Sequence, residues 1–225
     1  MRIALIGYGK MGKAIEAIAT ERGHHISATI TAKTEKQVFA SLLQTSDVAI
    51  EFTSPESATK NILQCFNLGI PVVCGSTGWL HEWEKIKEVC KKQSGALLYA
   101  SNFSIGVNIF FELNKKLATL MASQKTYDVD ITEIHHIQKK DAPSGTAISI
   151  AEGIFKHSDF KSWKLDETKG TELGITAIRE GEVPGTHSVF YRSEVDEIEI
   201  KHTAFNRNGF AVGAVIAAEW LPGKV

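Results

Sequence analysis

The first half of the chain alternates short apolar runs with helical patterns. Five runs predict β-strands, at residues 3–6, 26–30, 48–52, 70–74 and 96–100. Between the runs, apolar residues recur three and four positions apart, which is typical of helices that bury one face. The first such stripe comprises Met11, Ala14, Ile15, Ile18 and Ala19. Since the strands are mostly apolar without a strict alternation and helices separate them, we expect a parallel sheet with right-handed crossovers.

The second half has a different pattern. A helix is predicted over residues 107–121, and residues 128–136 (DVDITEIHH) alternate with the period of two that favours a strand. Further strands are predicted at residues 175–178, 188–191 and 197–203. Turns rather than long helices separate them, so we expect a mostly antiparallel sheet with helices on one face.

These patterns divide the chain into two domains of an α/β protein. Residues 157–174 are polar and weakly patterned, and residues 210–221 predict a final helix that returns to the first domain. We therefore expect a first domain over residues 1–103 that is completed by residues 209–225. Residues 104–208 would form the second domain, with an α+β mixed sheet.

Composition excludes several classes of function. The chain has 225 residues, a formal net charge of -1 and three cysteines that form no CxxC pair. A nearly neutral chain gives no global field for nucleic acid or membrane binding, and unpaired cysteines suggest a reducing compartment. The apolar run in MRIALIGYG is too short for a signal peptide. We expect a cytoplasmic protein with no membrane span, because no run approaches the roughly 20 apolar residues that a span requires.

A glycine-rich motif after the first strand predicts a nucleotide site. Gly7-Tyr8-Gly9-Lys10-Met11-Gly12 has the spacing GxGxxG and lies between a predicted strand and a predicted helix. Glycines let backbone amides approach a pyrophosphate, and the helix N-terminus adds partial positive charge. A tight turn without a ligand is the alternative reading.

Three further segments are candidates for cofactor contacts. The second strand ends without the acid that holds the ribose in many NAD-binding proteins, and it offers Thr31 and Lys33 instead. A cation there favours NADPH over NADH or the use of both, although Lys33 could equally be a solvated surface lysine. Two segments follow later strands, where open α/β sheets bind ligands: Gly75, Ser76 and Thr77, and Ala100, Ser101, Asn102 and Phe103.

The stretch EIHHIQKKDAPSGT, residues 133–146, concentrates charge and hydrogen-bonding groups. Alternation places Glu133 and His135 on one face of the strand, and His136 on the other. Adjacent histidines on a strand cannot chelate one metal, and no third ligand is spaced nearby, so no metal is expected. Of the two lysines, Lys139 is the candidate for a ligand contact, whereas Lys140 fits a solvated position.

The same stretch predicts a helix start that can hold a carboxylate. Pro143 suits the first turn, Asp141 or Ser144 can cap, and the amides of Gly145 and Thr146 would face an anion. A basic loop that only caps a helix is the alternative.

At this point the sequence resembles the 4-hydroxy-tetrahydrodipicolinate (dihydrodipicolinate) reductase family. The long motif Glu133-Ile134-His135-His136-x-x-Lys139-x-Asp141-Ala142-Pro143-Ser144-Gly145-Thr146 carries the likeness. Further matches are the nucleotide loop, Gly75 to Gly78, Ala100 to Val107, Arg179-x-Gly181, Gly185 with His187, His202-x-Ala204-x-x-Arg207, and Phe210 to Ala214.

The resemblance implies a fold and an activity. It implies a Rossmann-like parallel-sheet cofactor domain plus a mixed-sheet domain that binds substrate and builds a homotetramer. The expected reaction is the reduction of a cyclic dicarboxylate by NADPH or NADH, in the diaminopimelate route to lysine. By position, His135 matches the family's catalytic histidine and Lys139 its proton donor. The substrate contacts would be His136, Ser144, Gly145 and Thr146.

Two other readings remain. A nucleotide-binding module without catalysis, such as a redox sensor, would have no need of the second-domain motif. A different dehydrogenase with the same two-domain plan is the third reading. A semialdehyde dehydrogenase would need a nucleophilic cysteine in the second domain, but Cys65, Cys74 and Cys90 all lie in the first.

Overall fold

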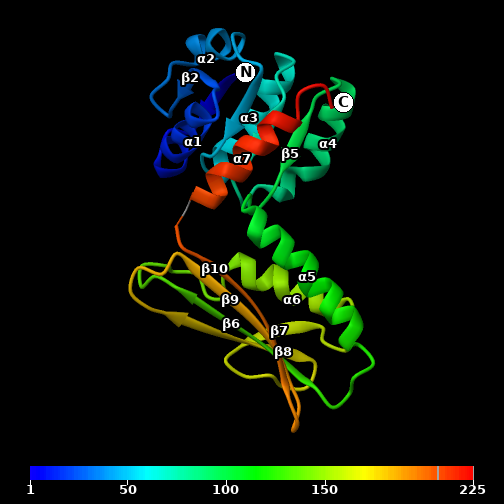
Figure 1. Ribbon diagram of the computed structural model, residues 1–225. Helices are drawn as coiled ribbons and strands as arrows, with labels where there is room; N and C mark the ends of the chain where they lie inside the picture. The colour runs from blue at the N-terminus through cyan, green and yellow to red at the C-terminus, as the bar shows by residue number, and fades with distance from the viewer. Residues whose placement is uncertain (207, 225) are drawn as a thin grey trace. The chain divides into compact units, whose positions relative to one another are not determined.

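The computed structural model describes residues 1–206 and 208–224, and of Lys36 and Gln37 it describes the backbone alone. The chain forms two compact units (Figure 1). Unit 1 comprises Met1–Ser104 and Asn208–Val225, and unit 2 comprises Ile105–Arg207. Residue 207, which was part of a sequence motif above, lies outside the described residues.

Unit 1 is built on a parallel sheet of five strands in the order β2-β1-β3-β4-β5. The strands are β1 (Arg2–Ile6), β2 (His25–Ile30), β3 (Val48–Glu51), β4 (Val72–Cys74) and β5 (Leu97–Tyr99). This strand order reverses direction between β1 and β3, which is where sheets of this type bind ligands beyond the carboxyl ends of their strands. The prediction of a parallel sheet is therefore confirmed.

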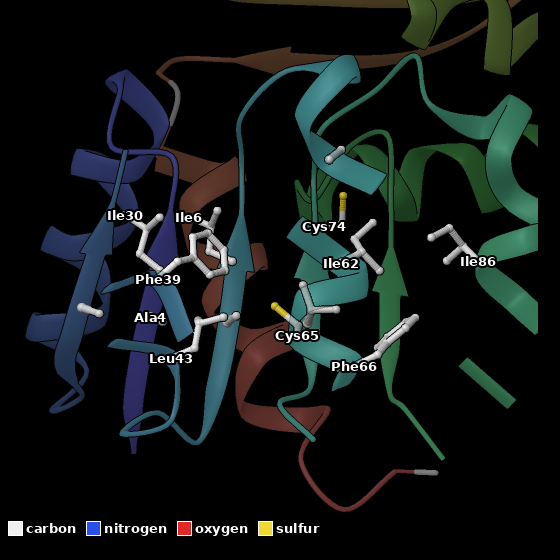
Figure 2. Close-up of a cluster of buried hydrophobic side chains, with 14 of the residues drawn as sticks. Ala4, Ile6, Ile30, Phe39, Leu43, Ile62, Cys65, Phe66, Cys74 and Ile86 are labelled. Carbon is white, nitrogen blue, oxygen red and sulfur yellow. The ribbon is translucent and has the colours of Figure 1, made fainter. Parts of the chain in front are cut away.

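Helices cover both faces of this sheet. They are α1 (Lys10–Glu21), α2 (Lys36–Leu43), α3 (Pro55–Asn67), a 3₁₀ turn η1 (Leu80–Glu82), α4 (Trp83–Lys92) and α7 (Asn208–Trp220). Strand β1 shows why both faces are apolar: Ala4 and Ile6 enter the core beneath α2 and α3, whereas Ile3 and Leu5 enter the core beneath α1 and α7. Figure 2 shows the first of these clusters, in which Ile6 and Ile30 surround Phe39.

The last helix packs closely on unit 1, as predicted. A side chain at Gly213 would place its Cβ only 1.6 Å from the carbonyl oxygen of Phe103. Glycine is therefore required there, because α7 approaches the backbone after β5. Helix α2 was not predicted: its single buried pair, Phe39 and Leu43, gives too weak a pattern over eight residues.

Unit 2 is a mixed sheet in the order β10-β9-β6-β8-β7 with two helices. Its elements are α5 (Ile105–Met121), β6 (Asp128–His135), α6 (Gly145–Phe155), β7 (Ser162–Leu165), β8 (Glu172–Arg179), β9 (Gly185–Arg192) and β10 (Glu197–Ala204). Both helices share one core with the inward residues of the sheet, among them Ile131, Ile150 and Ile175.

The pairing in this sheet differs from the sequence prediction. The pairs β9–β10 and β6–β9 are antiparallel, but β6–β8 and β7–β8 are parallel. The expectation of a mostly antiparallel sheet was therefore wrong for half of the pairs. The reason is α6, which lies between β6 and β8 as a crossover and returns the chain in the same direction. Strand β7 was also missed, because it lies at an edge and carries few apolar residues.

Within the described part of the chain, no helix combines the length and the apolar character needed to cross a membrane.

Candidate active site

The loop after β1 brings the start of α1 to the switch point of the sheet. Gly7 has φ of +97°, and a Cβ there would lie 2.0 Å from the carbonyl oxygen of Phe52. A Cβ on Gly12 would lie 2.3 Å from the carbonyl oxygen of Gly7. These two glycines are thus required by the protein's own packing. Gly9 faces open space and begins α1 without a side-chain cap, so this position leaves the amides of the first turn accessible to an anion.

A cavity of about 560 Å³ opens beside this loop. Its walls include Gly7, Tyr8 and Gly9 from the loop, Thr31 after β2, and Lys60 from α3. Thr31 closes a tight turn, since its hydroxyl oxygen accepts a hydrogen bond from the backbone N–H of Lys33 at an N–O distance of 3.2 Å. The side chain of Lys33 is not part of the cavity wall, whereas Lys60 is the one charged side chain among the described residues that line it.

The other predicted cofactor segments divide into buried and accessible positions. Ser76 is buried and its hydroxyl accepts the amide of Thr53 at 2.8 Å, so it ties two loops together. Phe103 is also buried, with its ring 5.9 Å from that of Phe52. Thr77 and Ser101 are exposed beside them. Gly75 contributes by its lack of a side chain, because a Cβ would lie 2.1 Å from the ring of Phe52.

The remaining members of the predicted cofactor set fall in the same two loops. Lys10 is exposed and Met11 is half-buried in the first turn of α1. Ala100 is half-buried after β5, and the side-chain oxygen of Asn102 accepts the amide of Ser104 at 2.8 Å.

In unit 2, the start of α6 has the predicted architecture with one change. Ser144 is the N-cap, and its hydroxyl accepts the amide of Ala147 at 3.1 Å. Pro143 was expected in the first turn but precedes the cap, and the side chain of Asp141 binds Lys139 instead of capping. No contact within the described residues uses the amides of Gly145 and Thr146. The helix start can therefore hold an anion.

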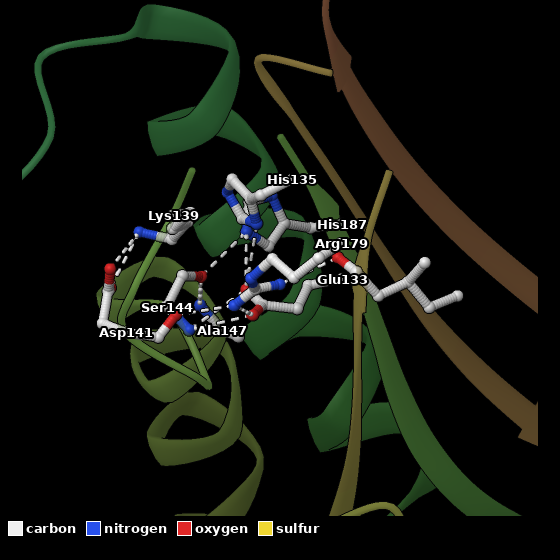
Figure 3. Close-up of polar contacts among 9 residues, drawn as sticks. Glu133, His135, Lys139, Asp141, Ser144, Ala147, Arg179 and His187 are labelled. Atoms are coloured by element: carbon white, nitrogen blue, oxygen red, sulfur yellow. Dashed lines mark hydrogen bonds and ion pairs between the residues drawn. The ribbon is translucent and has the colours of Figure 1, made fainter. Parts of the chain in front are cut away.

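The buried carboxylate of Glu133 organises the surroundings of this helix start (Figure 3). It accepts the amide of Ser144 at 3.0 and 3.1 Å and the Nη2 of Arg179 at 3.0 Å. Burial raises the pKa of Glu133, but hydrogen bonds with His187, Ser144 and Arg179 together outweigh this effect and lower the pKa to about 2. The carboxylate is thus charged at neutral pH, with Arg179 as its counterion.

Two histidines lie against this carboxylate. As expected, His135 shares the inner face of β6 with Glu133, and its Nδ1 lies 3.4 Å from Oε2 of Glu133. The His187 ring lies edge-on to that of His135 at 5.1 Å, and its Nε2 is 3.2 Å from the hydroxyl of Ser144. Burial is the main cause that lowers the pKa of His135 to about 4, so its imidazole is neutral at neutral pH.

The loop after β6 carries the two lysines and His136. Lys139 places its Nζ 2.9 and 2.7 Å from the two carboxylate oxygens of Asp141, and Lys140 is exposed, as predicted. His136 is half-buried; its carbonyl accepts the amide of Lys139 at 3.0 Å, and its Nδ1 is a buried atom without a hydrogen bond.

Sequence reasoning from the residues missed Arg179 and His187. They come from β8 and β9, far along the chain from Glu133, and only their place in the family's later motifs marked them. The premise that no third metal ligand lies near the histidines was also wrong. Ligand atoms of Glu133, His135 and His187 lie within 4.8 Å of one another. However, the guanidinium of Arg179 already neutralises Glu133 and opposes a cation at this place.

Comparisons with known proteins find similarity over nearly the whole chain. The family model described as dihydrodipicolinate reductase, N-terminus, matches residues 1–103, and the one described as its C-terminus matches residues 106–225. A 4-hydroxy-tetrahydrodipicolinate reductase from Christiangramia forsetii is 52% identical over 225 residues, covering 100% of this chain and 93% of the relative. One from Rickettsia bellii is 37% identical over 220 residues, covering 96% of this chain and 86% of the relative.

A solved structure shares the fold. The dipicolinate-bound dihydrodipicolinate reductase from Paenisporosarcina sp. TG-14 superposes with a TM-score of 0.75 at 23% identity. The match covers 97% of this chain and 92% of that chain, so the combination of a parallel and a mixed sheet is common to both.

Proposed function

Because the chain belongs to the dihydrodipicolinate reductase family, we propose that it converts the cyclic dicarboxylate 4-hydroxy-tetrahydrodipicolinate to tetrahydrodipicolinate. The 4-hydroxyl group leaves as water, and the resulting dihydrodipicolinate ring takes up one hydride and one proton. The reaction is a step of the diaminopimelate route to lysine and uses a reduced nicotinamide dinucleotide. It needs three things from the protein: a dinucleotide site, a carboxylate site and a proton donor. Each has a candidate among the residues described above.

The dinucleotide site is the cavity of unit 1. It fits the group because it lies at the switch point of the sheet and Gly9 leaves the start of α1 open to a pyrophosphate. When bound, the reduced nicotinamide supplies the hydride. Lys60 adds positive charge to the cavity wall, and no carboxylate belongs to the wall among the described residues. A positive charge without a nearby carboxylate favours the 2′-phosphate of NADPH. We therefore propose NADPH as the preferred cofactor and NADH as the weaker one.

The carboxylate site is the start of α6. The amides of Gly145 and Thr146 point out of a helix N-terminus whose dipole favours a negative charge. Ser144 directly precedes these amides, and His136 is proposed as a further side-chain contact, so a substrate carboxylate would be held by backbone donors together with side chains. Fixed donors of this kind orient the ring of the substrate, which is how binding contributes to the rate of hydride transfer.

Lys139 is the proposed proton donor. Hydride addition leaves electron density on a ring carbon and nitrogen, and a proton must neutralise it. An ammonium group supplies that proton and also stabilises the developing charge. His135 is proposed as the second catalytic group. Since its pKa is lowered to about 4 by burial, it would act as a neutral hydrogen-bonding imidazole and not as the acid.

One observation carries the proposal more than any other. The helix start whose two amides have no contact with the described residues follows directly on the loop that presents Lys139. The first amides of a helix have no intrahelical partner, so these two donors are available to a substrate carboxylate. Their adjacency in the chain supports an anion site close to a proton donor, as reduction of a dicarboxylate requires.

The proposal is tested by mixing the purified protein with NADPH and enzymatically generated substrate and following the nicotinamide absorbance. We expect NADPH oxidation that depends on both protein and substrate, and a lower rate with NADH. Tight binding of NADPH without substrate-dependent oxidation would favour the redox-sensor reading instead.

We also propose a homotetramer in the cytoplasm. The face of the unit 2 sheet opposite α5 and α6 carries Ile134 and its strand neighbour Ile178, which is 39% exposed. Burial of this face between copies would remove apolar surface from water. Free cysteines are typical of a reducing compartment. Light scattering coupled to gel filtration tests the tetramer, and a monomer at micromolar concentration would contradict it.

A further inference from the structure

The ammonium of Lys139 is held by a neighbour that has no assigned role. The two carboxylate oxygens of Asp141 accept hydrogen bonds from Nζ of Lys139, at 2.9 and 2.7 Å. The Lys139 side chain is 20% exposed, whereas that of Asp141 is 60% exposed. Burial raises the pKa of Asp141, but the hydrogen bond from Lys139, a backbone hydrogen bond and the positive charge of Lys139 together outweigh it, so that the pKa lies below its ordinary value. Asp141 therefore presents a charged carboxylate to the ammonium at neutral pH.

The backbone of Asp141 is anchored in turn. Its carbonyl oxygen accepts Nη2 of Arg179 at 2.6 Å, and the same nitrogen donates to Oε1 of Glu133 at 3.0 Å. The other terminal nitrogen, Nη1, donates to the carbonyl of Ile178 at 2.8 Å. One guanidinium thus joins the loop to two strands of the sheet.

These contacts form a continuous chain from the sheet to the ammonium. Glu133 lies on β6 and Arg179 on β8, which pair in parallel with His135 opposite Arg179. A guanidinium is planar and always charged, so its donors fix both acceptors at once. A lysine in its place would keep the charge, but its ammonium rotates on a flexible stem and it lacks the second nitrogen that binds the carbonyl of Ile178. The position of Asp141, and through it that of Lys139, therefore depends on the shape of Arg179.

We propose that Asp141 and Arg179 are positioning residues for the proton donor, acting through Glu133–Arg179–Asp141–Lys139. The proposal rests on the function proposed above, in which Lys139 donates the proton. Neither residue needs to touch the substrate. Their contribution is to hold the ammonium in one place before the substrate binds, so that less rearrangement is needed when the proton moves.

The test is a double-mutant cycle on kcat and KM. Asp141→Asn and Arg179→Lys are each made in the natural sequence and in Lys139→Ala. In the natural sequence we expect kcat to fall between about ten- and a hundredfold, since a displacement of about 1 Å can cost a hundredfold. KM should stay within about threefold, because the carboxylate site is intact. In the Lys139→Ala background each change should cost less than about twofold, since coupled residues are not additive.

Matched controls separate positioning from general damage. Glu182→Gln changes an exposed carboxylate in a nearby turn, and Arg192→Lys alters a guanidinium that binds Asp130 and Glu197 on the same sheet. Both should leave kcat near that of the natural sequence. Asp141 is exposed, so Asp141→Asn should fold normally. Thermal unfolding of Arg179→Lys shows whether the variant is folded at the assay temperature. If it is folded, a lower kcat does not come from loss of folded protein.

The outcomes distinguish the proposed donor role of Lys139 from the positioning role of Asp141 and Arg179. Equal losses in both backgrounds, or an unchanged kcat in Asp141→Asn and Arg179→Lys, would overturn the positioning role while Lys139 keeps its own. A near-normal rate in Lys139→Ala alone would remove the proposed donor and the positioning role together.

Discussion

Each unit contains a fully buried glutamate, and the two carboxylates have different kinds of hydrogen-bond partners. Glu133 in unit 2 has Arg179 as a counterion and accepts a backbone amide, with two histidines alongside. Glu51 in unit 1 lies at the end of β3, and its described partners are neutral: the hydroxyl of Thr53, the Asn61 amide at 3.3 Å and the Cys74 thiol at 3.1 Å. The first glutamate has a charged network, whereas the partners of the second among the described residues are neutral donors.

The difference matches what each unit is proposed to bind. In unit 1 the proposed pyrophosphate site relies on backbone amides, and Glu51 with its neutral donors fixes the loop that carries Thr53 beside the cavity. In unit 2 the site must hold an anion and move a proton, so charged side chains are fixed around the start of α6. Charged networks of this kind are costly when broken, because each partner is left buried without its counterion.

The largest effect is expected from comparing the two glutamates directly. Glu133→Gln leaves the Arg179 guanidinium without a counterion and should lower the free energy of unfolding by on the order of 3 kcal/mol. Glu51→Gln keeps its neutral neighbours and should cost about 1 kcal/mol. Urea unfolding of both variants measures the difference. Similar costs would show that Arg179 contributes little to the stability of the network.

Removal of a single amide tests the carboxylate site. Gly145 is the first residue of α6, a Cβ there meets no atom within 4 Å, and Ser144 before it has ψ of 155°. Proline is therefore compatible with this position and deletes only the N–H. Hydrogen bonds to charged groups contribute about 1.5–3 kcal/mol, so Gly145→Pro should raise KM about ten- to a hundredfold.

Gly145→Ala is the matched control, because it adds a side chain and keeps the amide. It should leave KM close to the natural value. If both variants bind substrate normally, the amide of Gly145 does not hold the carboxylate.

Acid should destabilise the network in two steps. The folded pKa of His135 is lowered to about 4, so the unfolded chain binds more protons and stability falls as pH drops from about 6.5 towards 4. The folded pKa of Glu133 is lowered to about 2, so its contribution is present above about 4.5 and lost towards pH 2.

Each group can contribute a slope of at most about 1.4 kcal/mol per pH unit. Urea unfolding at several pH values measures the slope. Glu133→Gln should reduce the lower step but not abolish it, because the pKa of Glu219 is also lowered to about 2. A stability that does not change between pH 6.5 and 4 would contradict the buried, neutral state of His135.

The smallest effect concerns the cofactor. Lys60 lines the cavity of unit 1 and Lys33 does not. An exposed ion pair contributes about 0.2–1 kcal/mol, so Lys60→Ala should weaken NADPH binding by up to about fivefold and leave NADH binding unchanged. Lys33→Ala is the control and should bind both cofactors normally. The reverse result would restore Lys33 as the contact with the 2′-phosphate.

The comparison of the two glutamates also shows what the sequence could predict. The loop from Gly7 to Gly12 and the start of α6 were visible because their residues are adjacent and have local preferences for turns and caps. Glu133 and His135 were placed on one face by alternation along a single strand. Arg179 and His187 join them only through pairing with other strands, and no local pattern encodes that pairing.

The same limit explains the remaining misses. Glu51 follows an apolar run, and nothing in that run marks it as buried with Asn61 and Cys74. Strand β7 depends on its neighbour β8 for its conformation and has few apolar residues of its own. Local patterns predicted most of the elements, whereas contacts between elements determined which side chains meet.

The most direct test of the account compares Lys139→Ala with Lys140→Ala in single-turnover reduction. Lys139 lies against Asp141 within the network, while its neighbour Lys140 is exposed and equally charged. We expect Lys139→Ala to slow reduction about 10²- to 10⁴-fold, as for loss of a general acid, with unchanged affinity for NADPH. Lys140→Ala should react at the natural rate. Equal rates in the two variants would contradict the assignment of Lys139 as the proton donor.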